Sequence, residues 1–341
     1  MLVLPARVRV GVTSGGAVMA DEETGMLVDT VRQEAHAIVR GGGEGLARAA
    51  RAAAVMRRFS AWNALLACRA RHGIPGLVFG WAQWEAMGRF PVSAEARIAL
   101  LSPVRRPVSR GADGVRRHVP LPGPEPSDGR ARWMRAGWVA VSAFDAPDTE
   151  GRPLESMFPK IPVPRRDEVF DMLGGMLGGL GMGVLVVPGD PKVRLSARSG
   201  PGPDPVVSYD PGLADPMMLA HLVAHLAVNG GTDERSRAWT LTVMLCSMLD
   251  APAPDVVPLP ERMGVVDVLE SCRMRLVRLE SYAPGRRRTG SGRGSLRMAL
   301  PSPNATGSRM APPGGAPRID WWDGLGELVF DAPCPVCGRN R

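Results

Sequence analysis

The chain has 341 residues, which is long enough for two domains of ordinary size. Hydrophobic residues make up 45% of the sequence, a proportion that excludes a chain disordered throughout. The net charge is +8, and 40 of the 42 basic residues are arginine, whose planar guanidinium suits phosphate, so the charge favours a nucleic-acid partner without identifying one.

The first half is predicted to mix helices and strands. Gly41-Gly-Gly43 separates the first two helices, and a polar loop rich in Pro, Gly and Arg covers roughly 105–131. We expect the strand over 137–144 to be buried on both faces, because the side chains on each of its two faces are mostly small or apolar. The elements are, in chain order, helices over 26–40 and 46–72, a strand over 77–80, a short helix over 81–87, and strands over 96–102 and 137–144.

An uncharged run over 172–189 reaches the length of a membrane-spanning helix. Its glycines and Pro188 argue against a span, and its first part shows a single apolar helical stripe. Gly181 is a natural helix end, and 184–187 is typical of a short strand. We therefore expect a helix followed by a buried strand, and no membrane partner.

The second half is predicted to be mainly helical, with helices near 216–228, 234–250 and 262–281. A Pro-rich connector over 145–166 precedes it, so we place a domain boundary there. The fold class is α+β. The predicted division is a first domain over 26–158, a second over 167–282, a disordered basic linker over 283–318 and a tail over 319–341.

Three segments of the first half carry a family resemblance in their order and spacing. They are Phe59-Ser-Ala-Trp-Asn63-Ala-Leu-Leu, then Gly80-Trp-Ala-Gln-Trp-Glu-Ala-Met-Gly-Arg89 leading into Ile98-Ala-Leu-Leu-Ser-Pro-Val104, then Val141-Ser-Ala-Phe-Asp145-Ala-Pro-Asp-Thr-Glu-Gly-Arg-Pro-Leu154. Together they resemble the N-terminal domain of the ArdC-type anti-restriction proteins. The resemblance implies a single-stranded DNA-binding module of mobile elements, which shields incoming DNA from host nucleases. The family usually has a Lys/Gly-rich turn where this chain reads Phe90-Pro-Val-Ser-Ala-Glu-Ala, so a cation that contacts the DNA backbone is missing.

Non-specific binding of a single strand needs cations for the phosphates and aromatic faces for the bases. The structural alternative is that tryptophans at helical spacing belong to the core and that a buried asparagine is a hydrogen-bonding strut. The candidate nucleic-acid-binding residues are Arg57, Arg58, Asn63, Trp81, Trp84, Arg89, Arg105 and Arg106.

A helix in the second half carries His221-Leu-Val-Ala-His225, two histidines spaced to share one helical face. Zinc peptidases hold their metal in this way, with a Glu beside the first His as general base. Here that position is Leu222, so hydrolysis by this route is not expected. The resemblance implies a degenerate zincin-like domain with a third ligand from the following helix, where Glu234 or Asp233 stands. The alternatives are a zinc site at His221, His225 and Glu234, or two histidines hydrogen-bonded in the core.

The five cysteines do not make a disulfide framework, which fits a reducing, cytoplasmic location. Cys334-Pro-Val-Cys337 resembles half of a zinc knuckle, but no second pair lies nearby. Cys246 and Cys272 fall on predicted helices, where we expect buried apolar residues.

The sequence favours a single-stranded DNA-binding protein of the anti-restriction type, without peptidase activity and with no cofactor required. One alternative is a zinc peptidase with Asp233 or Glu234 as an unusual base. Another is an interaction scaffold whose second domain or basic tail recruits nucleic acid or a protein partner.

Overall fold

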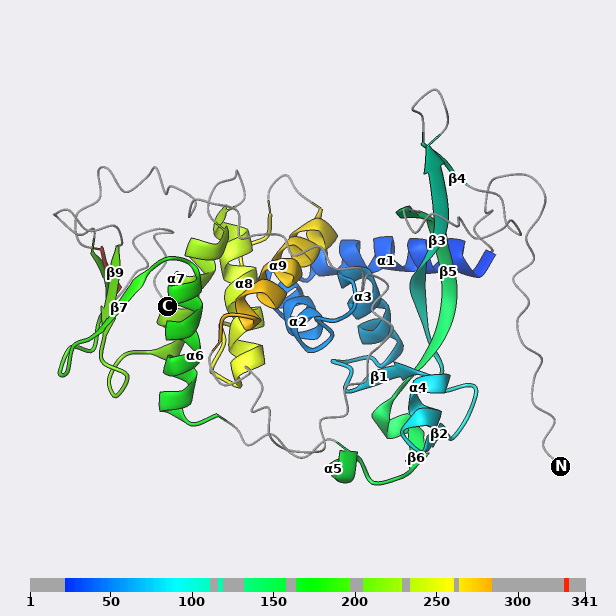
Figure 1. Ribbon diagram of the computed structural model, residues 1–341, viewed down its shortest axis with the longest axis horizontal. Coiled ribbons are helices and arrows are strands. Elements are labelled where there is room, and N and C mark those ends of the chain that lie inside the picture. The colour runs from blue at the N-terminus through cyan, green and yellow to red at the C-terminus, as the bar shows by residue number, and fades with distance from the viewer. Residues whose placement is uncertain are drawn as a thin grey trace.

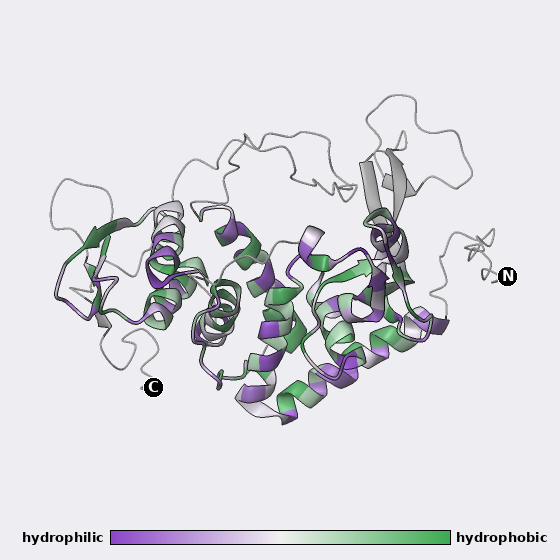
Figure 2. Ribbon diagram, turned by 90° about the horizontal axis from the view of Figure 1, so that it is seen from below, coloured by the Kyte–Doolittle hydropathy of each residue, from purple (hydrophilic) through white to green (hydrophobic). Residues whose placement is uncertain are grey.

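The computed structural model describes residues 22–110, 116–118, 132–157, 164–196, 205–228, 234–260, 264–283 and 328–330, and only the backbone at 104–110, 116–118, 132–137 and 328–330. The fold is α+β, as predicted. Helices lie between two sheets, one at each end of the molecule (Figure 1). Figure 2 shows alternating hydrophobic and hydrophilic bands along the helices, typical of helices that bury one face.

Three helices begin the described chain: α1 (Glu22–Arg40), α2 (Gly42–Val55) and α3 (Ala61–Ala70). The prediction of one continuous helix over 46–72 was wrong. Ser60 has an extended backbone, and its hydroxyl accepts a hydrogen bond from the Asn63 amide at 3.3 Å, so it caps a new helix. The break turns α3 away from α2 and toward the first sheet.

The first sheet is antiparallel, in the order β1-β5-β3-β4. Val141 and Ser142 of β5 are exposed, so the expectation that this strand is buried on both faces was wrong. The strands are β1 (Val78–Gly80), β3 (Ile98–Arg110), β4 (Arg116–His118) and β5 (Arg132–Asp145). Around its base lie α4 (Trp81–Ala86), the paired strands β2 (Arg89–Pro91) and β6 (Thr149–Gly151), the 3-10 turn η1 (Ala146–Asp148) and α5 (Leu154–Met157).

Strands β3 and β5 run much further than the sequence indicated, into the region expected to be a polar loop. They form a narrow ribbon that extends beyond the helices (Figure 1). Pro103 and Pro107 suggested an end to the strand because proline cannot donate to a ladder. Both nevertheless lie within the ladder, opposite Trp138 and Trp133, and a register shift falls between Val104 and Arg105.

The second sheet has the order β10-β8-β9-β7, with β7 (Gly183–Val186), β8 (Val193–Ser196), β9 (Val206–Tyr209) and β10 (Leu328–Phe330). Helix α6 (Arg166–Gly179) precedes β7, so the uncharged run divides into a helix and a strand as predicted. Gly181 ends the helix with a φ of +83°, and the Met182 amide donates to the Leu177 carbonyl at 3.0 Å. No helix among the described residues is both long and apolar enough to cross a bilayer. The strand is an exposed edge, however, so the expectation of a buried strand was wrong.

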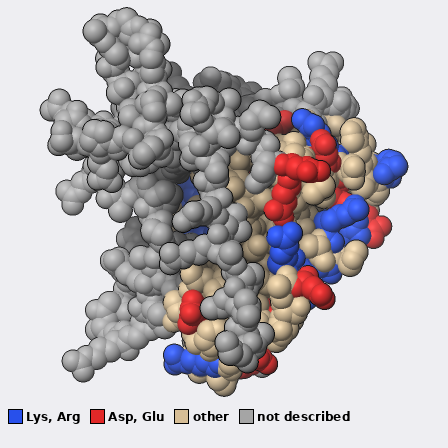
Figure 3. Space-filling model, turned by 90° about the vertical axis from the view of Figure 1, so that its right-hand side faces the viewer, with Lys and Arg blue, Asp and Glu red and all other residues tan. Residues whose placement is uncertain are grey.

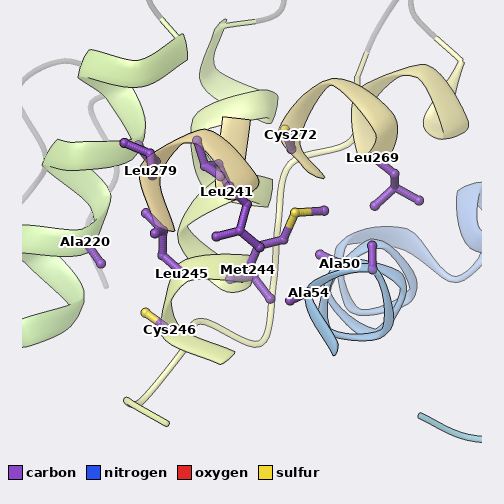
Figure 4. Packing of buried hydrophobic residues seen from close by; sticks show 14 of the residues in the cluster. Ala50, Ala54, Ala220, Leu241, Met244, Leu245, Cys246, Leu269, Cys272 and Leu279 are labelled. Atoms are coloured by element: carbon purple, nitrogen blue, oxygen red, sulfur yellow. The ribbon is translucent and has the colours of Figure 1, made fainter. Parts of the chain in front are cut away.

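Helices α7 (Pro216–Val228), α8 (Glu234–Leu249) and α9 (Val265–Glu280) lie close to their predicted limits. One continuous cluster of buried residues extends from Val31 to Ala283 and includes both halves of the chain. In Figure 4, Met244 of α8 reaches toward Ala50 and Ala54 of α2. The limits 26–158 and 167–282 therefore do not correspond to two separate cores. A smaller cluster around Trp84 lies under α4.

Candidate nucleic-acid interface

Asn63 joins α3 to β3 and does not face solvent. Its Nδ2 donates to the Leu101 carbonyl at 2.9 Å, and its Oδ1 accepts from the Leu101 amide at 2.8 Å. The side chain is only 7% exposed. These two bonds occupy the amide edge that would read a base, so Asn63 is a structural strut and leaves the candidate interface.

Trp84 and Arg89 are also buried. Trp84 ties α4 to β5, and Arg89 ties β2 to the segment after β5. The Trp84 ring has no exposed surface, and its Nε1 donates to the Phe144 carbonyl at 3.0 Å. Arg89 donates to the Thr149 hydroxyl and carbonyl and to the Arg152 carbonyl. A base cannot stack on an enclosed ring, and Arg89 is only 8% exposed, with each of its three guanidinium nitrogens donating to the protein. Both predictions of DNA contact were therefore wrong.

The three segments of the family resemblance are thus held together by their own characteristic residues. Asn63 links the first segment to the second, and Trp84 and Arg89 link the second to the third. Asp145 closes the third, since its carboxylate accepts from the Ala146 and Gly76 amides at 2.8 and 3.1 Å. These four residues explain how the base of this sheet is built, and their buried side chains do not form a binding surface.

Arg57 forms a bidentate ion pair with Glu280. The distances from Nε to Oε2 and from Nη2 to Oε1 are each 2.9 Å. Burial lowers the pKa of its guanidinium. Arg58, the next residue, is exposed. Trp81 is 43% exposed and packs edge-on against Phe144 at 5.9 Å between ring centroids. Arg58 and Trp81 therefore keep the exposure that a DNA contact requires, whereas Arg57 does not.

Arg105 and Arg106 lie on the outer part of β3, beyond the register shift. The register places Arg105 opposite Arg135 and Arg110 opposite Arg116. Seven arginines fall on this part of the sheet, and its strands contain no acidic residue until Asp145 at the base. We call this outer part the arginine ribbon: Arg105, Arg106, Arg110, Arg116, Arg117, Arg132 and Arg135, with Trp133 between the last two.

Sequence reasoning missed five of these arginines. It placed Arg110, Arg116 and Arg117 in a loop over 105–131, and it began the next strand only at 137, after Arg132 and Arg135. The signal was present at 132–135, where Arg-Trp-Met-Arg directly precedes a clear strand pattern. The rest of this end of the molecule carries mixed charge. Figure 3 shows acidic and basic side chains interspersed over the described part of that face. Several form ion pairs there, for example Arg97 with Glu23 at 3.0 Å. Within the ribbon, by contrast, the described strand residues include seven arginines and no acidic residue.

His221 and His225 share one face of α7, as predicted, but they lie inside the core with 0% and 2% exposure. Their Nε2 atoms are 3.2 Å apart. The Thr242 hydroxyl donates to the Ala238 carbonyl and so accepts from His221 Nδ1, at 2.8 Å. The Trp239 ring lies over His221 at 3.9 Å between centroids. The pair is therefore part of the packing between α7 and α8.

The third ligand expected from Glu234 does not join the histidine pair in a metal geometry. Glu234 Oε1 lies 3.6 Å from His225 Nδ1, across the ring from the Nε2 atom that faces His221. Among the described residues, no group of three or more His, Cys, Asp or Glu side chains is placed to hold a metal ion. A catalytic zinc also needs an open position for water, which these buried rings do not offer. The described residues do not fit a zinc centre, and Asp233 lies outside them.

Cys246 and Cys272 are buried apolar residues, as expected, and burial raises the pKa of each thiol to about 12. Neither thiol is therefore ionised near neutral pH. Cys334 and Cys337 lie outside the described residues, as do nearly all of the linker and tail.

No protein-family model matches the chain, and no curated protein does. A search of solved structures finds the metal-free crystal structure of the antirestriction ArdC protein from the R388 plasmid. The similarity has 11% sequence identity and a TM-score of 0.33, and it covers 66% of this chain and 83% of that one. A likeness of this size establishes neither fold nor function.

Proposed function

We propose that this chain binds single-stranded DNA through the arginine ribbon, as an anti-restriction type protein that handles the DNA of mobile elements and has no peptidase activity. The observation that carries the proposal is the register of the ribbon. Like charges directly opposite each other destabilise a ladder. Arg105 opposite Arg135 and Arg110 opposite Arg116 are arranged in this unfavourable way, and a polyanion laid along the strands would relieve the repulsion.

A single strand is favoured over a duplex by the aromatic residues that accompany the cations. Trp133 stands next to Arg132 in β5, opposite Pro107, and Trp81 is exposed at the start of α4. Unpaired bases can stack on an indole, whereas the bases of a duplex are already stacked on each other. The resemblance of the segments between 59 and 154 to the ArdC-type proteins favours the same partner.

The test is binding of the full-length chain to a labelled oligonucleotide, as a single strand and as a duplex, over a range of salt concentrations. The triple variant Arg105→Ala, Arg106→Ala, Arg135→Ala should bind single strands more weakly. Its slope of log K against log salt should be smaller by about 2, since each phosphate contact on a single strand contributes about 0.7.

The matched control is the triple variant Arg40→Ala, Arg48→Ala, Arg235→Ala. It removes three exposed arginines that lie on helices, outside the ribbon. It loses the same net charge and should retain the wild-type slope. Equal losses in both triple variants would reduce the binding to non-specific attraction and overturn the ribbon as the site. Tighter binding to duplex would instead indicate a ribbon that enters a groove.

The absence of peptidase activity is supported by Leu222 at the position of the general base and by the burial of both histidines. The chain should not cleave a denatured protein substrate with added zinc. Zinc-dependent cleavage that disappears in His221→Ala would overturn this part of the proposal.

A further inference from the structure

Strand β7 forms an open, apolar edge of the second sheet. It is last in the order β10-β8-β9-β7 and pairs with β9 alone among the described strands. Val184, Leu185 and Val186 are 41%, 54% and 53% exposed. The sheet lies at the left-hand end of the molecule in Figure 1, and Figure 2 shows hydrophobic residues on the strands there. Natural edge strands are usually protected by Lys, Pro or a bulge, and β7 has none of these.

The opposite edge of the same sheet is covered by another strand of the chain. There β10 from the end of the chain pairs with β8, with Leu328 opposite Leu195 and Phe330 opposite Val193. The chain therefore covers one edge with its own residues, while no described strand covers the other. An exposed edge with three consecutive aliphatic residues favours the addition of another strand.

The hydrogen bonds of β7 define which groups its open side presents. The Gly183 amide donates to the Pro205 carbonyl, and the Val187 amide donates to the Tyr209 carbonyl, both at 3.0 Å. Because successive residues of a strand direct these groups to opposite sides, residues 183, 185 and 187 face β9. The amides and carbonyls of Val184 and Val186 therefore face outward.

We propose that β7 pairs antiparallel with β7 of a second copy of this chain, about a two-fold axis at Leu185. In this register Val184 of one copy lies opposite Val186 of the other, so every outward amide and carbonyl of both strands is paired. Leu185 lies opposite its own counterpart. Registers centred on Val184 or Val186 leave some of these groups unpaired.

A second copy is favoured as the occupant because the strand is compatible with itself. A charged residue near a two-fold axis would face a like charge, and 183–187 contains no charged residue. A strand from a different partner would gain no specificity from charge on this edge, since none is available to recognise it. The apolar side chains on both faces of β7 would become covered by their own symmetry mates.

The first test is the mass of the full-length chain in solution, measured by light scattering or sedimentation over about a hundredfold range of concentration. We expect a concentration-dependent dimer, and a monomer for Leu185→Lys. Leu213→Lys is the matched control, because Leu213 is exposed to nearly the same extent, 55%, and lies in a turn. A wild-type chain that stays monomeric, or a Leu185→Lys variant that still forms dimers, would overturn the proposal.

The second test is specific to the register and uses a background in which Cys334 and Cys337 are serine. Residues opposite each other in a non-hydrogen-bonded antiparallel pair lie about 4.5 Å apart at Cα, within reach of a disulfide. Leu185→Cys should therefore cross-link two chains on mild oxidation, and Val184→Cys should not, because its partner is Val186. Cross-linking of Val184→Cys alone would contradict the axis at Leu185, and a different register would replace it.

Discussion

Arg57 and Glu280 form a two-bonded ion pair between residues 223 positions apart in the chain. Arg57 lies in the turn between α2 and α3, and α9 holds this turn at two further points. The Arg273 guanidinium donates to the Arg57 carbonyl at 2.8 Å, and the Glu270 carboxylate accepts from the Ala61 amide at 2.7 Å. The last described helix thus fixes the break between α2 and α3, which is where the sequence suggested an uninterrupted helix.

Glu280→Gln tests the ion pair. The Glu280 side chain is 8% exposed and that of Arg57 is 21% exposed, so the variant leaves a largely buried guanidinium without its counter-charge. We expect the free energy of unfolding to fall by about 2 kcal/mol in denaturant titrations. Asp29→Asn, which breaks an exposed pair with Arg32, should change it by less than about 0.5 kcal/mol. Equal changes in the free energy of unfolding would show that the buried pair stabilises the fold no more than the exposed pair does.

The two tryptophans of α4 should respond to substitution in opposite ways. Trp84→Ala removes a fully buried ring and should cost about 3–5 kcal/mol of stability. Trp81→Ala should cost less than about 1 kcal/mol of stability, because the residue is 43% exposed. It should weaken single-strand binding by roughly fivefold, because a base that stacks on the indole loses that contact. Trp84→Phe keeps a folded chain for comparison and should bind DNA as the wild type does. Weakened DNA binding in Trp84→Phe without loss of stability would show that Trp84 contributes to the DNA interface.

Glu270 gives the fold a defined dependence on pH. Burial by itself raises the pKa of this carboxyl, but hydrogen bonds from Arg273 and the Ala61 amide outweigh burial, so its pKa lies below the ordinary 4.5. Its stabilising contribution is complete above the unfolded-state pKa and is lost as the pH falls through the lower folded-state value. The difference in unfolding free energy between the wild type and Glu270→Gln should therefore be constant near neutral pH and shrink below pH 4.5. A difference that persists unchanged to lower pH would assign the effect to packing.

Metal removal should leave the melting temperature unchanged. His221 and His225 are held by each other, by Thr242 and by the Trp239 ring, and the described residues supply no third ligand. Bound zinc at a hundred times its dissociation constant would add about 2.7 kcal/mol of stability, which calorimetry detects easily. A melting temperature that falls with chelator and rises with zinc, in the wild type but not in His225→Ala, would establish a metal site there.

Helix α7 was predictable because its start is marked in the sequence and most of its residues are apolar. Pro216 follows the capping Asp215, whose carboxylate accepts from the Met217 amide at 2.9 Å, and this is visible in the sequence. The break at Ser60 was missed because the apolar spacing of α2 continues smoothly into α3. The contact that holds this break against α9 comes from a residue more than 200 positions later, which local spacing does not reveal.

The candidate site was predicted much less well than the fold. Aromatic and basic residues in a motif are compatible with binding and with burial, and spacing alone cannot distinguish the two. Trp84, Arg89 and Asn63 turned out to be buried because three distant segments meet around them. The arginine ribbon depends on a pairing between strands more than 20 residues apart, which local patterns do not encode.

The register shift in the ribbon rests on one extra residue in β5. Val104 lies opposite Gly137 and Arg105 opposite Arg135, so Ala136 has no partner across the ladder. Between Ala136 and the base of the sheet, odd-numbered residues of β5 lie opposite even-numbered residues of β3. In the outer part of the ribbon, even-numbered residues of β5 lie opposite even-numbered residues of β3. Ala136 therefore sets the phase of the outer strand relative to the base. If Ala136 instead paired with Arg105 in a regular ladder, every outer residue of β5 would move to the other face of the sheet, and Arg132 and Arg135 would exchange faces although no arginine would be lost from the chain.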